Sequence, residues 1–269
     1  MYEVVRLPKE KALPVLNRYY GSVENPEGKL LLAKALAWFG SSEGNHLIIQ
    51  ELQDMFEQET KQGYPDGFVD TYDDIRGREK NMLIGLYWRI NQNIGLLAMT
   101  DDQEPVNSIR HILDNSSSGG KMVQRENDYY DHRIDLKIVP FHNRIFNLCF
   151  YAERNPDPAL IPGFEKLLQD PHLGNYITLD YDRTRWRVYG GDLELFMASS
   201  LARCGSKTGY NLLADYLEDI HYNFKQFALS ELQVLTNRDF KYNSQAWNNH
   251  FDGLTWPQPC KKLQKEIEV

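Results

Sequence analysis

The 269-residue sequence predicts an all-α protein, an α-α superhelix of about four helix pairs with insert loops and one short β-hairpin. Two observations predict this fold class. First, the turns that join consecutive helices resemble one another, which is typical of a repeat. Second, apolar residues recur three and four positions apart, as on one face of a helix, in the segments 27–39, 45–59, 81–99, 104–114, 133–153, 158–169, 192–204, 209–219 and 221–235.

The predicted organisation is a single domain over residues 1–269. Residues 1–26 hold a lead-in helix, residues 27–235 hold the repeats, and residues 236–269 form a capping tail. Because the last helix pair of such an array has no following neighbour, its open face needs a cover. The tail offers three aromatic side chains for this purpose: Phe240, Tyr242 and Trp247.

Each second helix is expected to begin at a residue with a short side-chain oxygen, which can accept a hydrogen bond from a free N–H of the first turn. The predicted N-caps are Ser41, Asp102, Asp157 and Ser206. Apolar residues recur at fixed places around each cap and are expected to be buried between the helices. Five residues before the caps lie Leu36, Leu97, Ala152 and Leu201; seven after lie Ile48, Ile109, Phe164 and Leu213; eleven after lie Leu52, Leu113, Leu168 and Leu217.

Glycine and proline give further signals for helix ends. Gly40 and Gly205 are predicted to end the first helices of their pairs in a left-handed conformation. Pro158 follows the cap Asp157, at a first helical position where a missing N–H has no cost. Pro140 falls inside the predicted helix 133–153 and is expected to bend or split it. An antiparallel helical bundle is the alternative architecture.

The spacing between caps exceeds that of compact two-helix repeats, so insertions are expected after the second helices. They occupy residues 60–80, 115–131 and 170–191. The first contains the acidic run 66–74, which lacks the spacing of a calcium loop and predicts a solvated loop. The third contains YITL and RTRWRVY on either side of Asp180–Asp182, and their alternation predicts the hairpin.

The turn and second helix, clearest in DPALIPGFEKLL, resemble HEAT-like repeats of the phycobilisome-lyase type. The segments LAKALAWFGSSEG, NIGLLAMTDDQEPVNSIRHIL, LLQDPHLGNYIT and GGDLELFMASSLARCG, in this order, are similar to the helical C-terminal region of FAD-dependent oxidoreductases. The resemblance covers residues 27–235 and implies a helical module separated from, or related to, such an enzyme. The G-x-G-x-x-G fingerprint of the flavin domain is absent. No cofactor is therefore predicted in this chain, and FAD is expected only with a separate flavin domain.

Charge and residue spacing exclude several functions. With 30 basic and 38 acidic residues the formal net charge is −8, which opposes binding to nucleic acid or to an anionic membrane. His132 and His142 are ten residues apart, which is not the spacing of two ligands on one helix face, so no metal site is predicted. Ser199, Ser200 and Cys204 lie in an apolar helix and are predicted to pack in the core, so no catalytic residue is assigned.

The predicted function is that of a non-catalytic interaction or scaffold module, because helical superhelices offer an extended face to other chains. The expected partner is a protein, a peptide or a sister catalytic domain. The predicted partner-binding residues lie in the inserts and are aromatic or charged: Tyr129, Tyr130, Asp131, His132, Tyr181, Arg183, Arg185 and Trp186. The alternative is an enzyme in which Asp131, His132 and Arg185 perform acid–base chemistry on a small polar substrate.

Overall fold

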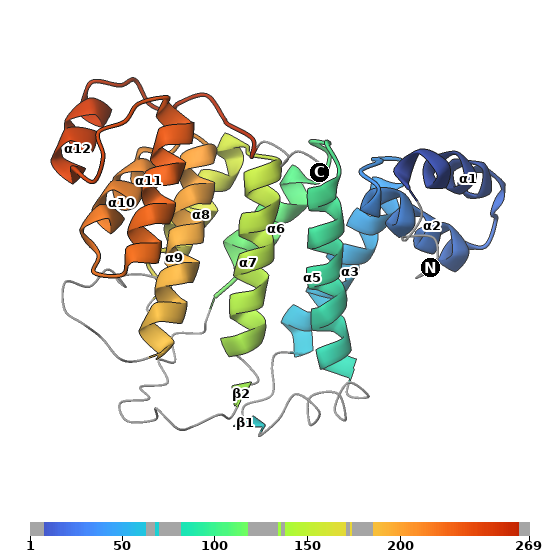
Figure 1. Ribbon diagram of the computed structural model, residues 1–269. Coiled ribbons are helices and arrows are strands. Elements are labelled where there is room, and N and C mark those ends of the chain that lie inside the picture. The colour runs from blue at the N-terminus through green and yellow to red at the C-terminus, as the bar shows by residue number, and fades with distance from the viewer. Residues whose placement is uncertain are drawn as a thin grey trace. The chain divides into compact units, whose positions relative to one another are not determined.

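The computed structural model describes residues 8–62, 68–69, 82–117, 134–135, 138–170, 173 and 185–263. In these ranges the protein is all-α, apart from one small two-stranded sheet (Figure 1). The chain divides into two compact units. Unit 1 comprises residues 1–112 and 134–140, and unit 2 comprises residues 113–133 and 141–269.

Unit 1 is built from helices that pack on one another in sequence order. They are α1 (Lys9–Ser22), α2 (Pro26–Trp38), α3 (Asn45–Gln62), α5 (Met82–Met99) and the greater part of α6 (Val106–Asn115). The strands β1 (Phe68–Val69) and β2 (Ile134–Asp135) pair antiparallel, with Phe68 opposite Asp135. The packing of α3 against both α2 and α5 makes these three helices the centre of the unit.

Unit 2 holds the remaining helices. They are α7 (Ile138–Arg154) from Phe141 onward, the 3₁₀-helix η2 (Pro158–Leu160), α8 (Ile161–Leu167), α9 (Arg185–Arg203), α10 (Lys207–Asp215), the 3₁₀-helix η3 (Tyr216–Glu218), α11 (Tyr222–Thr236) and α12 (Ser244–Asp252). The helices α7, α9 and α11 lie side by side (Figure 1). Every helical segment predicted from the sequence overlaps a helix of the structure, which confirms the all-α fold class.

The predicted caps lie at the starts of the second helices or in the turns that lead into them. Ser41, Asp102 and Asp157 each accept a hydrogen bond from the backbone N–H two residues later, over 2.8–3.3 Å, and so cap the turn that leads into the helix. Ser206 occupies the N-cap position of α10, but its hydroxyl donates to the carboxylate of Glu165 at 2.9 Å instead. Ser206 thus lies at the predicted N-cap position and Asp157 at that of η2, whereas Ser41 and Asp102 lie four residues before α3 and α6 and cap the preceding turn instead.

The repeated apolar positions around the caps are buried, as predicted, with one exception. Leu168 is partly exposed, and its neighbour Leu167 is buried in its place. Gly40 and Gly205 have φ angles of 79° and 94°, which confirms the predicted left-handed helix ends. Both ends also carry the same pair of backbone hydrogen bonds, in which the glycine and the following serine donate to carbonyls of the last helical turn.

One predicted helix begins later than expected. Residues 134–135 form strand β2, and α7 starts at Ile138 rather than at 133. Pro140 therefore lies in the first turn of a continuous helix, where its missing N–H removes no intrahelical hydrogen bond. The prediction that Pro140 would bend or split a longer helix is wrong for this reason.

The predicted hairpin is wrong in its second half. Residues 185–189, read as a strand, belong to α9, and the segment YITL lies outside the described residues. The alternation in RTRWRVY coincides with a helical period, because Trp186, Tyr189 and the buried Leu193 are spaced as on one helix face.

The tail of the chain covers the end of unit 2. Trp247 is fully buried against α10 and α11, and its ring meets that of Phe240 edge-on at 4.9 Å. This confirms the covering role predicted for these two residues. Tyr242 instead lies at the surface, 41% exposed, and donates its hydroxyl hydrogen to Gln226 at 2.7 Å.

Residues 258–263, here called the strap, cap the carboxyl ends of three helices. Backbone N–H groups of the strap donate to the carbonyl of Glu153 in α7 at 2.8 Å and to that of Arg203 in α9 at 2.9 Å. The ammonium of Lys261 donates to the carbonyl of Leu235 in α11. These carbonyls have no partner inside their own helices, so the strap satisfies them. The shared strap also shows that α7, α9 and α11 run in the same direction.

Candidate functional site

The predicted partner-binding side chains lie outside the part of the chain that the structure describes. Only the backbone of two of them, Arg185 and Trp186, is described, in the first turn of α9. The others fall between the described ranges: Tyr129, Tyr130, Asp131, His132, Tyr181 and Arg183. The partner site in the inserts therefore stays a prediction, and so does the acid–base alternative.

Helices α2, α3 and α5 of unit 1 form a groove with a volume of about 330 Å³. It exists because α2, with the sequence PEGKLLLAKALAW, is apolar on nearly all sides and can bury only part of its surface. The residues that define the groove are Leu31, Lys34 and Trp38 from α2, Glu51 from α3, and Arg89 and Leu96 from α5.

The walls of the groove are apolar. Leu31 and Trp38 are seven residues apart on one stripe of α2 and remain 54% and 51% exposed. Leu96 of α5 lines the groove as well. Soluble proteins rarely leave such large apolar side chains together on the surface unless another molecule covers them.

The groove contains one buried ion pair and one exposed arginine. Lys34 and Glu51 form an ion pair in which both side chains are largely buried, and Asn93 donates to the same carboxylate at 2.7 Å. Arg89 is exposed, and within the described part of the chain it forms no hydrogen bond or ion pair. Among the described residues, the groove therefore combines a neutral polar floor with the unpaired positive charge of Arg89.

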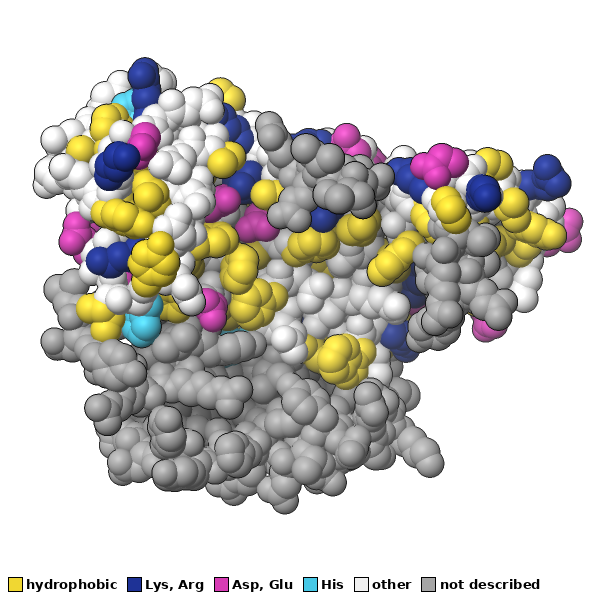
Figure 2. Space-filling view, in the orientation of Figure 1, with side chains coloured by type: hydrophobic (Ala, Val, Ile, Leu, Met, Phe, Trp, Pro, Cys, Tyr) yellow, Lys and Arg dark blue, Asp and Glu magenta, His cyan; other side chains and the backbone are white. Residues whose placement is uncertain are grey.

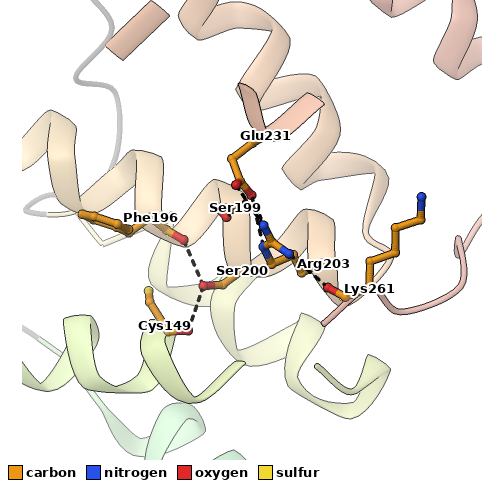
Figure 3. A network of polar contacts seen from close by, with 7 residues as sticks. All are labelled: Cys149, Phe196, Ser199, Ser200, Arg203, Glu231 and Lys261. Carbon is orange, nitrogen blue, oxygen red and sulfur yellow. Dashed lines mark hydrogen bonds and ion pairs between the residues drawn. The ribbon is translucent and has the colours of Figure 1, made fainter. Parts of the chain in front are cut away.

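Unit 2 contains a network of polar contacts around Arg203 (Figure 3). This buried guanidinium donates through Nε and Nη2 to both oxygens of Glu231, at 3.1 and 2.9 Å, and through Nη1 to the carbonyl of Lys261 at 3.3 Å. The hydroxyl of Ser199 also donates to Glu231, at 2.8 Å. The network joins α9, α11 and the strap.

A second carboxyl adjoins this network. Burial, followed by the negative charge of Glu231, raises the pKa of Glu153 to about 7, and the charge of Arg203 only partly opposes them. Glu153 thus lies near the carboxylate of Glu231 and near the guanidinium groups of Arg203 and Arg154. The described residues contain no group of three or more His, Cys, Asp or Glu side chains placed to hold a metal ion.

The possible nucleophiles of unit 2 are buried in the core, and nothing in their surroundings activates them among the described residues. Ser199, Ser200 and Cys204 are fully buried, which confirms the prediction that they belong to the core. Burial raises the pKa of Cys204 to about 12, so its thiol stays protonated at neutral pH and is a poor nucleophile. The hydroxyl of Ser200 lies between the carbonyls of Phe196 and Cys149, at 2.9 and 3.3 Å.

A histidine–carboxylate pair at the start of α11 closes a turn. Asp219 is fully buried, and its Oδ1 lies 2.7 Å from both the backbone nitrogen and Nδ1 of His221. His221 is the N-cap residue of α11. Because the two residues are two apart in sequence and share a local turn, the contact has the geometry of a helix start.

Comparison with protein families, characterised proteins and solved structures finds no match to this chain. Membership of a HEAT-like family and kinship with FAD-dependent oxidoreductases therefore stay predictions. No helix among the described residues is long and apolar enough to cross a bilayer.

The sequence analysis predicted neither the groove nor the network of polar contacts around Arg203. The run LLLA in α2 gave a signal for the groove, because it is broader than one buried stripe requires. Arg89 gave none, since its freedom from partners depends on the fold. Glu153 and Glu231 belong to different helices far apart in the chain, so their proximity could not be inferred.

Proposed function

We propose that this chain is a non-catalytic interaction module that binds an amphipathic helix of a partner protein in the groove of α2, α3 and α5. The observation that carries this proposal is the exposure of Leu31 and Trp38 beside Arg89, whose charge is unpaired within the described part of the chain. Helix-in-groove recognition uses apolar anchors on one face of the bound helix, and an open apolar groove is its usual receptor.

The dimensions and charge of the groove select the partner. A volume of about 330 Å³ accommodates a few side chains rather than a folded domain. The anchors would be apolar residues one turn apart, lying between Trp38 and Leu96. An aspartate or glutamate beside them would pair with Arg89, whereas a basic residue would be repelled.

The finer architecture is also part of the proposal: the helix pairs stack as HEAT-like repeats. Polar contacts between successive turns support this arrangement. Asn45, at the start of α3, donates to Thr100 and to the cap Asp102 at 3.0 and 2.9 Å, and Glu165 of α8 accepts from the cap Ser206. If the alliance with a flavin enzyme is correct, a sister catalytic domain is one source of the bound helix.

The test uses a fluorescein-labelled helical peptide of leucine and glutamate, about 18 residues long, titrated with the full chain and followed by fluorescence anisotropy. We expect saturable binding that Arg89→Glu weakens about tenfold, because the charge reversal replaces attraction by repulsion. Trp38→Ala removes an exposed apolar wall and is expected to weaken binding by a similar factor.

The matched control is Arg238→Glu, which makes the same charge change at an exposed arginine of unit 2. It should leave the affinity within about twofold of the unmodified chain. Failure of the peptide to bind, or equal loss in Arg89→Glu and Arg238→Glu, would contradict the proposed function.

A further inference from the structure

Cys260 of the strap lies against Cys204, the residue that follows the last turn of α9. Backbone N–H groups of the strap donate to the carbonyls of Arg203 and Gly205, at 2.9 and 3.0 Å. The Sγ atom of Cys260 lies 3.5 Å from the carbonyl oxygen of Cys204, between these two hydrogen bonds. In Figure 1 the strap crosses the upper end of unit 2, where Figure 2 shows hydrophobic and basic side chains at the surface.

The close approach of the two segments depends on Gly205. A Cβ at this position would lie 2.1 Å from the carbonyl oxygen of Gln258, so only glycine leaves room for the strap. The hydrogen bonds pair Gln258 with Gly205 and a later strap residue with Arg203, which makes the segments antiparallel and places Cys260 opposite Cys204. Backbones paired in this way bring opposed Cα atoms to about 5 Å, and a disulfide spans about 4.4–6.8 Å between Cα atoms.

The two thiols differ in their access to solvent. Cys260 is exposed, whereas Cys204 is fully buried. Burial is the main cause that raises the pKa of each thiol, and the negative charge of Asp157 contributes in both cases. Both sulfur atoms thus lie near the same carboxylate and stay largely protonated at neutral pH, so they react slowly and only under a sustained supply of oxidant.

We propose that Cys204 and Cys260 form a modification site, at which a low-molecular-weight disulfide such as oxidised glutathione links the two thiols and fastens the strap to α9. In the first step the thiolate of Cys260 attacks one sulfur of the reagent, forms a mixed disulfide and releases the other half, which takes up the proton that Cys260 lost. In the second step the thiolate of Cys204 attacks the sulfur of Cys260 and releases the remaining half as a thiol, which takes up the proton from Cys204. Two protein thiols are oxidised, and one reagent disulfide is reduced to two thiols.

Cys149 of α7 is the third cysteine of the chain and is not expected to join the pair. It is fully buried, and its side chain shares a hydrogen bond with Ser200 in the core. A dissolved reagent reaches neither Cys149 nor Cys204 directly. Cys260 at the surface is therefore the thiol at which the reaction begins, and the buried sulfur beside it completes the link.

The disulfide closes a loop from residue 204 to residue 260, which contains α10, η3, α11 and α12. A cross-link over such a loop stabilises the folded state mainly by restricting the unfolded chain. It also fixes the strap where it caps the carboxyl ends of α7, α9 and α11. The stability of unit 2 thus depends on the thiol–disulfide balance of its surroundings. No residue of the groove takes part, so this proposal is independent of the proposed function.

The experiment equilibrates the folded full chain with mixtures of oxidised and reduced glutathione, alkylates the remaining thiols and maps the disulfides by tryptic digestion and mass spectrometry. We expect a single link, between Cys204 and Cys260, that dithiothreitol reverses. The urea midpoint of the linked chain should lie about 1 M above that of the reduced chain. Cys260→Ser should lose the link and the shift, while its reduced stability stays unchanged because serine has nearly the same shape at this exposed position. Cys149→Ala is the control and should form the same link.

Several results would overturn the proposal. If Cys260 stays unmodified, or if the reaction stops at its mixed disulfide with glutathione, Cys204 is out of its reach. A link between Cys204 and Cys149, or between the Cys260 thiols of two chains, would assign the reaction to a different pair. A link that forms only in urea would show that the unfolded chain, and not the contact between the strap and α9, brings the thiols together.

Discussion

Replacing Glu153 by glutamine should make the protein more stable at alkaline pH. Burial and the charge of Glu231 raise the pKa of this carboxyl from its ordinary 4.5 to about 7. The folded protein therefore holds the proton more tightly than the unfolded chain does. Its stability is highest below about pH 4.5 with respect to this group, decreases as the pH rises towards 7, and stays at the lower value above that.

The size of the effect follows from the same shift. At about 1.4 kcal/mol per pH unit, ionising Glu153 in the folded state costs roughly 3 kcal/mol, and solvent at the partly exposed carboxyl reduces this to about 2 kcal/mol. Glutamine has the same shape and never ionises. The free energy of unfolding of Glu153→Gln should thus exceed that of the unmodified protein by about 2 kcal/mol at pH 8.

The assay is urea unfolding followed by far-UV circular dichroism between pH 5 and pH 8. The difference between the two proteins should shrink towards zero at pH 5, where Glu153 is protonated. Glu57→Gln, at an exposed glutamate that pairs with Lys61 on the same helix, serves as the control and should show no such trend. A glutamine variant that is no more stable at pH 8, or whose advantage is the same at pH 5, would refute the reasoning.

Three further substitutions test the packing of unit 2 by urea unfolding. Arg203→Ala leaves Glu231 without its buried partner and should cost about 3 kcal/mol, whereas Lys207→Ala breaks an exposed pair with Asp252 and should cost about 0.5 kcal/mol at most. Gly205→Ala should cost about 2 kcal/mol, because φ is +94° and a Cβ would lie 2.1 Å from the carbonyl oxygen of Gln258. Its control, Gly253→Ala, should be nearly neutral, because a Cβ there meets nothing closer than 3.5 Å. Trp247→Ala empties a fully buried site and should cost about 4 kcal/mol, against about 0.5 kcal/mol for the exposed Trp88→Ala. Equal losses within any of these pairs would contradict the contacts assigned here.

Local chemistry explains why the helix pairs could be predicted from the sequence. A cap such as Asp157, a left-handed glycine such as Gly205 and the apolar residues at fixed distances from them all act within one or two helical turns. Because these signals recur at the same spacing in each pair, they determine where each helix of the pair begins and ends. The burial of Leu36, Ile48 and Leu52 around one cap follows from this register.

Where the local signal supports two structures, the prediction failed. RTRWRVY alternates like a strand and also places Trp186 and Tyr189 on one helix face, and the continuation through Leu193 decides for the helix. The strand at Ile134–Asp135 pairs with residues far away in the chain, which no local pattern shows.

The surfaces assigned here depend on tertiary packing. Leu31 and Trp38 have the same apolar character as the buried Leu36, and only the docking of α3 and α5 determines which of them remain exposed. The raised pKa of Glu153 arises in the same way, from a neighbour on another helix. The exposure of Leu31 and Trp38 and the raised pKa of Glu153 can be seen in the structure, but the spacing of residues in the sequence does not predict them.

The central claim is that the groove of α2, α3 and α5 receives a partner helix, and photo-crosslinking tests it most directly. A leucine–glutamate peptide with a benzophenone side chain at one anchor position would be bound to the full chain, irradiated and mapped by mass spectrometry. We expect crosslinks to α2 and α5 near Leu31, Trp38 and Leu96, and at a peptide concentration below Kd their yield should fall about tenfold in Arg89→Glu and stay unchanged in Arg238→Glu. Crosslinks that map to unit 2, or whose yield is the same in Arg89→Glu as in the unmodified chain, would contradict the claim.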